Sequence, residues 1–183
     1  MARNIRVSTI AYQPVPTGEN RLERTHGKMR ELLEEAARAK PDLVALPEFC
    51  NVLGLSMEDS LAAAEEIPGP TSEVCSEIAR KHGMYIVLPI PERLDGKFYN
   101  TAALIGRDGE IVGKYNKYQP TIGEIEEGIV PGSDAPAFDT DFGKVGCAIC
   151  FDLKFPEVGQ LLAKNGAQLV VYATMFIGGE RLG

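Results

Sequence analysis

Val145-Gly-Cys-Ala-Ile-Cys-Phe-Asp-Leu-Lys-Phe-Pro-Glu157 is an apolar stretch that ends abruptly in a polar turn. Its first part predicts a buried strand, and its second part leaves the thiol of Cys150 at the end of that strand. Open α/β proteins place their chemistry at the ends of strands. A reactive cysteine needs a base or a positive charge nearby, whereas a structural cysteine is a small apolar core residue. The partners of Cys150 must therefore come from the rest of the chain.

The rest of the chain alternates between apolar strands and amphipathic helices. The segment Asp42-Leu-Val-Ala-Leu-Pro-Glu48 is apolar on both faces, which is typical of a sheet covered on both sides. Asp108-Gly109 is a strong hairpin signal, so antiparallel pairing joins the βαβ alternation. Helices are predicted at about residues 19–40, 56–66, 71–82 and 156–165, and strands at about residues 6–11, 42–48, 85–89, 101–105, 111–115, 144–149 and 168–172. We therefore expect an α/β fold.

Two segments between these elements carry local signals. Pro68-Gly69-Pro70 separates two predicted helices, and Thr71 is the expected N-cap of the second. Residues 115–135 contain several Pro and Gly residues and four carboxylates without a clean period. This pattern predicts a long ordered loop, and loops of that length are usually functional or disordered.

Composition and charge exclude several classes of protein. With 183 residues, 44% of them hydrophobic and 25% charged, the chain suits one globular domain over residues 1–183. A net charge of −7 without a block of Lys or Arg argues against nucleic acid or an anionic membrane as a partner. No signal peptide or membrane span is visible, and four cysteines at irregular spacing fit a reducing compartment. We therefore expect a cytoplasmic protein with a small-molecule ligand.

Glu48, Lys117 and Cys150 each stand at the end of an apolar strand or in the long loop. A carboxylate can act as a general base, a lysine can stabilise a thiolate and an oxyanion, and a cysteine can attack a carbonyl or nitrile carbon. Together they would suffice for acyl transfer without a metal or a cofactor. Their spacing alone is a weak signal, because most α/β proteins of this size have such residues near strand ends.

Three motifs resemble, in their order along the chain, those of the nitrilase or carbon-nitrogen hydrolase superfamily. These are Leu46-Pro-Glu48 for the catalytic glutamate, Gly113-Lys-Tyr-Asn-Lys117 for the catalytic lysine and Ile149-Cys150-Phe-Asp152-Leu-Lys-Phe-Pro-Glu157 for the nucleophile elbow. The resemblance implies a four-layer αββα sandwich, incomplete at its C-terminus, and assembly into a homo-oligomer. It further implies that Glu48 is the general base, Lys117 stabilises the tetrahedral intermediate and Cys150 forms a thioester. The backbone N–H of Phe151 would complete the oxyanion hole.

Many members of this superfamily use a second glutamate after the lysine, and the sequence offers two candidates. Lys117-Tyr-Gln-Pro-Thr-Ile-Gly-Glu124 resembles the nitrilase pattern and favours Glu124. Glu127-Gly-Ile-Val-Pro-Gly132 resembles the pattern of aliphatic amidases and favours Glu127. We favour Glu124, and the alternative that both are solvated loop carboxylates stays open.

The residues around the nucleophile indicate the substrate class. Phe151-Asp152 resembles the aromatic-Asp pair of amidases and carbamoyl-amide hydrolases, whereas nitrilases tend to have Trp-Glu there. The resemblance therefore implies a small amide or N-carbamoyl substrate before a nitrile. Gly178-Gly179 resembles the substrate-pocket loop of the same superfamily.

Three alternatives compete with this interpretation. Cys147 and Cys150 form a Cys-x-x-Cys pair, but Cys147 falls inside a predicted strand, and alternation would turn the two thiols to opposite faces. A zinc site would need a second ligand pair, which the sequence does not show. A truncated member could keep the motifs without a closed pocket and be non-catalytic. Within the elbow, Asp152 and Lys154 could pair with each other or simply cap the turn.

Overall fold

A computed structural model describes residues 4–175 of the chain. Its elements are, in order, β1 (Val7–Thr9), α1 (Arg21–Ala37), β2 (Leu43–Ala45), α2 (Met57–Ala62), α3 (Pro70–His82), β3 (Tyr85–Leu94), β4 (Lys97–Ile105), β5 (Ile111–Asn116), α4 (Ile122–Glu126), β6 (Ala137–Thr140), β7 (Gly143–Ile149), the 3-10 helix η1 (Cys150–Lys154), α5 (Pro156–Lys164) and β8 (Leu169–Ala173). No helix among these residues is both long and apolar enough to cross a bilayer.

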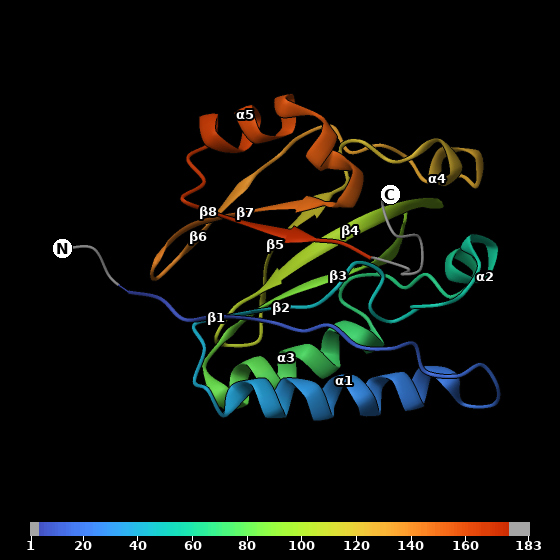
Figure 1. The fold of residues 1–183 in the computed structure, drawn as a ribbon, viewed down its shortest axis with the longest axis horizontal. Coiled ribbons are helices and arrows are strands. Elements are labelled where there is room, and N and C mark those ends of the chain that lie inside the picture. Colours follow the sequence, from blue (N-terminus) through green and yellow to red (C-terminus); the bar gives the residue numbers. More distant parts are fainter. Residues whose placement is uncertain (1–3, 176–183) are drawn as a thin grey trace, which may run out of the picture.

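The elements stack in four layers, α-β-β-α (Figure 1). One sheet has the strand order β1-β2-β3-β4-β5, parallel from β1 to β3 and antiparallel from β3 to β5. The second sheet has the order β6-β7-β8, with β6 antiparallel and β8 parallel to β7. Helices α1 and α3 cover the outer face of the first sheet, and α5 covers the outer face of the second. The expected αββα sandwich is therefore present.

Strand β2 shows why the first sheet is covered on both faces. Leu43, Val44 and Ala45 are all buried, as the apolar pattern predicts. Because successive side chains in a strand point to opposite faces, Val44 joins the core under α1 and α3, while Leu43 and Ala45 join the core between the sheets. The inter-sheet core also contains Cys147 of β7, which is fully buried.

Several local predictions need correction. Thr71 is not the N-cap of α3, since the N-cap is Gly69 and Pro70 is the first helical residue. Proline suits that position because its fixed φ is already helical and its missing N–H would have no partner there. The backbone N–H of Thr71 instead donates to Oε2 of Glu65 over 2.7 Å.

The loop predicted at residues 115–135 and the residues that follow it, up to β7, are more regular than the sequence indicated. This stretch contains the short helix α4 (Ile122–Glu126) and the strand β6 (Ala137–Thr140). Both are too short to show a clear period in sequence. Strand β3 runs to Leu94, five residues beyond the predicted end, because it pairs with β4 as far as the hairpin that joins them.

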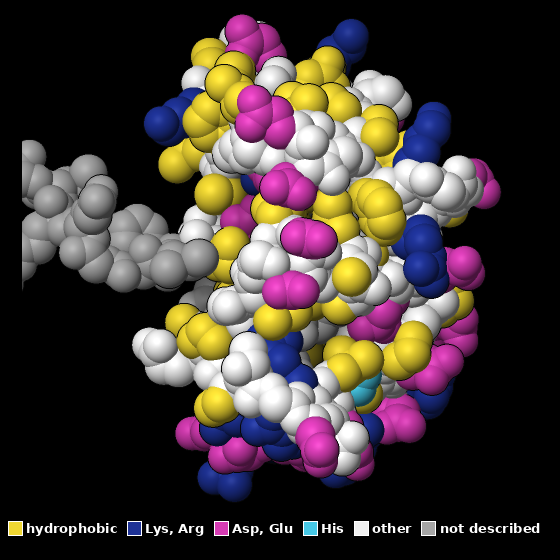
Figure 2. All heavy atoms as spheres, turned by 90° about the vertical axis from the view of Figure 1, so that its right-hand side faces the viewer, with side chains coloured by type: hydrophobic (Ala, Val, Ile, Leu, Met, Phe, Trp, Pro, Cys, Tyr) yellow, Lys and Arg dark blue, Asp and Glu magenta, His cyan; other side chains and the backbone are white. Residues whose placement is uncertain are grey.

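The carboxyl ends of β7 and β8 point toward the end of the molecule where α2 and α4 lie (Figure 1). Figure 2 looks onto that end and shows acidic side chains along the middle of the face, with hydrophobic side chains between them. Exposed acidic residues of these helices and their ends include Glu58, Asp59, Glu126 and Glu127. The candidate site lies behind this surface, at the strand ends.

Candidate active site

Glu48 stands three residues after the end of β2. The backbone N–H of Leu46 donates to the carbonyl of Val87 over 3.1 Å, so the segment stays beside β3 after the strand has ended. The turn is tight, because Phe49 has a φ of 53°, in the left-handed region that few L-residues adopt. The side chain of Glu48 is consequently held inside the protein, with 3% of its surface exposed.

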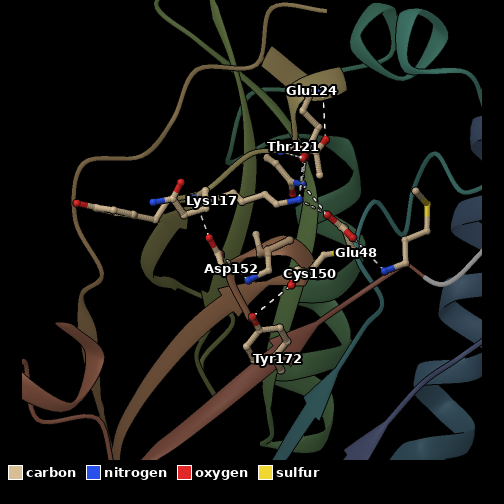
Figure 3. Close-up of polar contacts among 12 residues, drawn as sticks. Glu48, Lys117, Thr121, Glu124, Cys150, Asp152 and Tyr172 are labelled. Atoms are coloured by element: carbon tan, nitrogen blue, oxygen red, sulfur yellow. Dashed lines mark hydrogen bonds and ion pairs between the residues drawn. The ribbon is translucent and has the colours of Figure 1, made fainter. Parts of the chain in front are cut away.

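Lys117 directly follows β5, and its ammonium group points back to Glu48 (Figure 3). Its Nζ lies 3.0 Å from Oε1 of Glu48, and 3.0 Å and 2.8 Å from the two carboxylate oxygens of Glu124. Its backbone is fixed as well, because its N–H donates to the carbonyl of Asn100 over 2.8 Å. Lys117 is 2% exposed, so these carboxylates compensate a charge that has lost its water.

Glu124 reaches the site through a capping box at the start of α4. Its backbone N–H donates to the hydroxyl of Thr121 over 3.2 Å, and its Oε2 accepts from the backbone N–H of Thr121 over 2.7 Å. The sequence Thr121-Ile-Gly-Glu124 fits the Ser/Thr-x-x-Glu pattern of such a box, which is the signal that could have identified the helix. Glu127, the other candidate, is exposed on the surface and lies outside this arrangement.

Cys150 is the first residue of η1, immediately after β7. Its φ is 43°, a strained value for a residue with a Cβ, and such strain often marks a functional position. The side chain is half-buried, whereas Cys50, Cys75 and Cys147 are fully buried. The hydroxyl of Tyr172, in β8, donates to the carbonyl of Cys150 over 3.3 Å (Figure 3).

Asp152 holds the turn that carries Cys150. Its buried carboxylate accepts three hydrogen bonds, from the backbone N–H of Ile149 over 2.8 Å, from the backbone N–H of Gln119 over 2.8 Å and from the hydroxyl of Tyr115 over 2.6 Å. Asp152 thus connects its own turn to β5 and to the segment that follows Lys117. Lys154, the partner suggested by sequence, instead places its Nζ 5.3 Å from the centre of the Phe151 ring.

The structure also brings in residues that sequence analysis missed. The backbone N–H of Met175 donates to Oε2 of Glu48 over 3.0 Å. The amide of Asn100 donates to Oε1 of Glu48 and to Oε1 of Glu124, over 2.8 Å each. The hydroxyl of Thr174 hydrogen-bonds with Cys150. A polar Asn100 inside the apolar strand β4 was the available signal, whereas nothing in sequence marked Thr174 or Met175.

The charged groups of the site shift one another's protonation. Burial lowers the pKa of Lys117, but attraction to Glu48 and Glu124 outweighs burial and raises that pKa above its usual range. Burial raises the pKa of Glu124, but Lys117 and the hydrogen bonds from Thr121 and Asn100 together bring it below its usual range. At neutral pH the ammonium and the Glu124 carboxylate are therefore both ionised.

The thiol of Cys150 behaves differently. Burial and the nearby charge of Glu48 raise its pKa above the usual thiol value, and the hydrogen bond with Thr174 and the charge of Lys117 offset this only in part. The resting side chain is therefore a neutral thiol. Attack on a carbon atom then requires that a base remove the proton during the reaction, and Glu48 is within hydrogen-bonding contact of the thiol.

Phe151 and Cys147, which sequence analysis also singled out, lie on either side of Cys150 in the chain. Phe151 is the second residue of η1, and its ring packs edge-on against Phe155 at 5.3 Å. Burial raises the pKa of Cys147 to about 12, as expected for a packing residue of β7. All four cysteines are free in the structure, and the redox interpretation stays a prediction that mild oxidation would test. Gly178 and Gly179 lie outside the described residues.

Comparison with known proteins agrees with this fold. The model of the carbon-nitrogen hydrolase family matches residues 6–182, nearly the whole chain. The chain belongs to the carbon-nitrogen hydrolase family.

Among curated proteins, omega-amidase NIT2-B of Xenopus laevis is 36% identical to this chain over 181 residues. The match covers 93% of this chain and 63% of that protein. Among solved structures, a carbon-nitrogen hydrolase from Helicobacter pylori G27 superimposes with a TM-score of 0.78 at 23% identity, covering 93% of this chain and 59% of that one. Saccharomyces cerevisiae Nit3, of the nitrilase superfamily, gives a TM-score of 0.74 at 28% identity, covering 85% and 59%. This chain therefore spans about 63% of the length of the Xenopus laevis relative.

Proposed function

We propose that this chain hydrolyses the carbon–nitrogen bond of a small amide through a thioester on Cys150. The observation that carries the proposal is the meeting of Glu48, Lys117 and Cys150 at three strand ends, in a chain of the carbon-nitrogen hydrolase family. An amide is favoured because relatives that match 93% of the chain are named omega-amidases. N-carbamoyl compounds and nitriles are less favoured substrates of the same residues.

The first half of the reaction forms the thioester. Sγ of Cys150 attacks the amide carbon while its proton passes to the carboxylate of Glu48. The oxygen of the substrate becomes an oxyanion, which Lys117 and the backbone N–H of Phe151 stabilise. The C–N bond then breaks, and the leaving nitrogen takes the proton from Glu48 and departs as ammonia.

The second half regenerates the enzyme. A water molecule attacks the thioester carbon and gives a proton to Glu48, and collapse of the new tetrahedral intermediate breaks the C–S bond. The thiolate of Cys150 recovers its proton from Glu48, and a carboxylic acid leaves. Glu124 stays ionised beside Lys117 and keeps the ammonium group in place through both halves.

The test measures ammonia release from a panel of small amides, ureido acids and nitriles, together with intact mass. The parent protein is expected to release ammonia and to show an acyl adduct, and Cys150→Ala is expected to lose both. Cys147→Ala is the matched control, because it removes a buried thiol three residues away and should remain active. Equal ammonia release from the parent and from Cys150→Ala would refute the proposal.

The other sequence-based expectations on assembly and partners remain predictions. We still expect a homo-oligomer, which light scattering in solution would test. The net charge of −7 still argues against a nucleic-acid partner, and a filter-binding assay would test that.

A further inference from the structure

Asn100 lies in the middle of β4, and it is fully buried. Its Nδ2 is 2.8 Å from Oε1 of Glu48 and 2.8 Å from Oε1 of Glu124, two residues that are far apart in the sequence. Its backbone carbonyl accepts from the N–H of Lys117 over 2.8 Å. Asn100 therefore contacts both carboxylates through its side chain and the backbone of Lys117 through its carbonyl.

The orientation of the Asn100 amide follows from its neighbours. An ionised carboxylate only accepts hydrogen bonds, so the amide must turn its NH2 group, which has two donors, toward Glu48 and Glu124. Its Oδ1 is then buried without a hydrogen-bond partner among the residues that the structure describes. A leucine of similar size would fill this space without an unpaired oxygen, so packing alone does not explain an asparagine.

The two carboxylate oxygens of Glu48 differ in how many hydrogen bonds they accept. Oε1 accepts from both Asn100 and Lys117, so both of its lone pairs are in use. Oε2 accepts from the backbone N–H of Met175 over 3.0 Å and keeps room for one more hydrogen. The proton of the Cys150 thiol can therefore be received on Oε2 while Oε1 stays fixed.

Charge explains why a neutral donor is useful here. Glu48 and Glu124 are two negative groups with one cation, Lys117, between them. The repulsion between the carboxylates would favour their separation or the uptake of a proton. Asn100 supplies one N–H to each carboxylate without adding charge, and it therefore holds both near Lys117.

We propose that Asn100 is a positioning residue of the site, whose amide holds Glu48 and Glu124 around Lys117 so that Oε2 of Glu48 receives the proton of Cys150. This inference rests on the proposed hydrolysis. The proton moves from Sγ of Cys150 to Oε2 of Glu48 as the S–C bond forms, and Asn100 itself neither gains nor loses a proton. Asn100 thus acts through Glu48 and Glu124 rather than on the substrate.

The test replaces Asn100 with leucine and measures the pH dependence of kcat/KM. Loss of its donors should lower kcat at least tenfold with little change in KM, and should move the acid limb of the profile upward by about one pH unit. A second readout needs no substrate: the Glu124 carboxyl is titrated by NMR in protein with 13C-labelled glutamate, and it should protonate at a higher pH in Asn100→Leu. A role in packing alone would move neither titration.

Asn51→Leu is the matched control. Asn51 is also fully buried, its Nδ2 donates to a glutamate, Glu65, over 3.1 Å, and its Oδ1 is also unpaired. Its variant should keep the acid limb and the Glu124 titration of the parent. The same shift in both variants would overturn the proposal, and so would unchanged titrations in folded Asn100→Leu.

A second substitution covers the case in which Asn100→Leu does not fold. Asn100→Ser keeps one donor and should give a smaller shift in the same direction. If neither variant folds while Asn51→Leu does, Asn100 belongs to the fold rather than to the site, and the proposal is wrong. If the parent hydrolyses no member of the panel but the Glu124 titration shifts as expected, the hydrolytic function fails while the control of the carboxylates by Asn100 stands.

Discussion

The hydroxyl of Tyr115 donates to the carboxylate of Asp152 over 2.6 Å, and both side chains are buried. This bond joins the end of β5 to the turn after β7. Because Lys117 lies two residues after Tyr115, and Cys150 lies two residues before Asp152, the bond sets the position of the lysine relative to the thiol. The N–H of Gln119, which also donates to Asp152, makes the same connection a second time.

Asp152→Asn should therefore weaken both the fold and the activity. An asparagine oxygen can accept from Tyr115 and Ile149, but its NH2 group would then face the N–H of Gln119, a contact between two donors. We expect a loss of about 1–3 kcal/mol in the free energy of unfolding, measured by urea denaturation, and a lower kcat. Tyr115→Phe removes the bond to Asp152 and the one that the hydroxyl oxygen accepts from the N–H of Tyr118 over 3.1 Å, but it brings no two donors together. It should therefore cost less than Asp152→Asn, about 1–2 kcal/mol. Equal losses in the two variants would contradict this account.

The pH dependence of alkylation should identify the state of the Cys150 thiol. The thiolate is the reactive form, and the pKa of Cys150 is raised by burial and by Glu48. The rate with iodoacetamide should therefore be low at neutral pH and should keep rising above about pH 8.5, the usual thiol range. Cys150 should still be labelled before the three buried cysteines. Intact mass and peptide mapping measure both properties.

Two substitutions test whether each neighbouring charge raises or lowers the pKa of Cys150. Glu48→Gln removes a negative charge and should move the alkylation profile of Cys150 to lower pH, whereas Lys117→Met removes a positive charge and should move it to higher pH. A rate that is already maximal at pH 6 in the parent would mean that a thiolate is preformed, and the general-base step would then be wrong.

Glu124 and Glu127 provide a matched pair for acid stability. The folded pKa of Glu124 is below its unfolded value, so its contribution to stability is present above the unfolded pKa and is lost as pH falls through the folded pKa. Glu124→Gln should lower the free energy of unfolding by ~3 kcal/mol at neutral pH and weaken the fall in Tm on acidification. Glu127→Gln, on an exposed side chain, should change stability by less than about 0.5 kcal/mol. Similar melting curves for the two variants would show that Glu124 is not part of the ion-pair network.

Gly132 and Gly123 give a second matched pair. A Cβ on Gly132 would lie 2.2 Å from the carbonyl oxygen of Asn116, while the N–H of Gly132 donates to the carbonyl of Lys117 over 2.8 Å. Gly132→Ala should therefore displace the lysine segment and lower both Tm and activity. Gly123 has no atom within 4 Å of such a Cβ and lies in α4, where alanine favours the helix by about 1 kcal/mol. Gly123→Ala should fold at least as stably as the parent in thermal denaturation.

Much of the fold was predictable because its signals are local. The apolar run at β2, the Asp108-Gly109 turn between β4 and β5, and the Pro156 start of α5 are each visible in a few neighbouring residues. The capping by Gly69 and the strand β6 were missed because their evidence is short. The length of β3 was missed because a strand ends where its partner ends, and no local pattern states which strand that partner is.

The sequence by itself determined which residue types are available: a thiol after an apolar strand, a glutamate after another and a lysine after a third. Only the tertiary structure decided which of them share one buried site. It places Glu124 rather than Glu127 beside Lys117, and it adds Asn100 between the two carboxylates. The physical reason is that charge compensation acts over a few ångströms in space, and residues 69 positions apart in the chain meet at that distance only through sheet pairing and sheet packing.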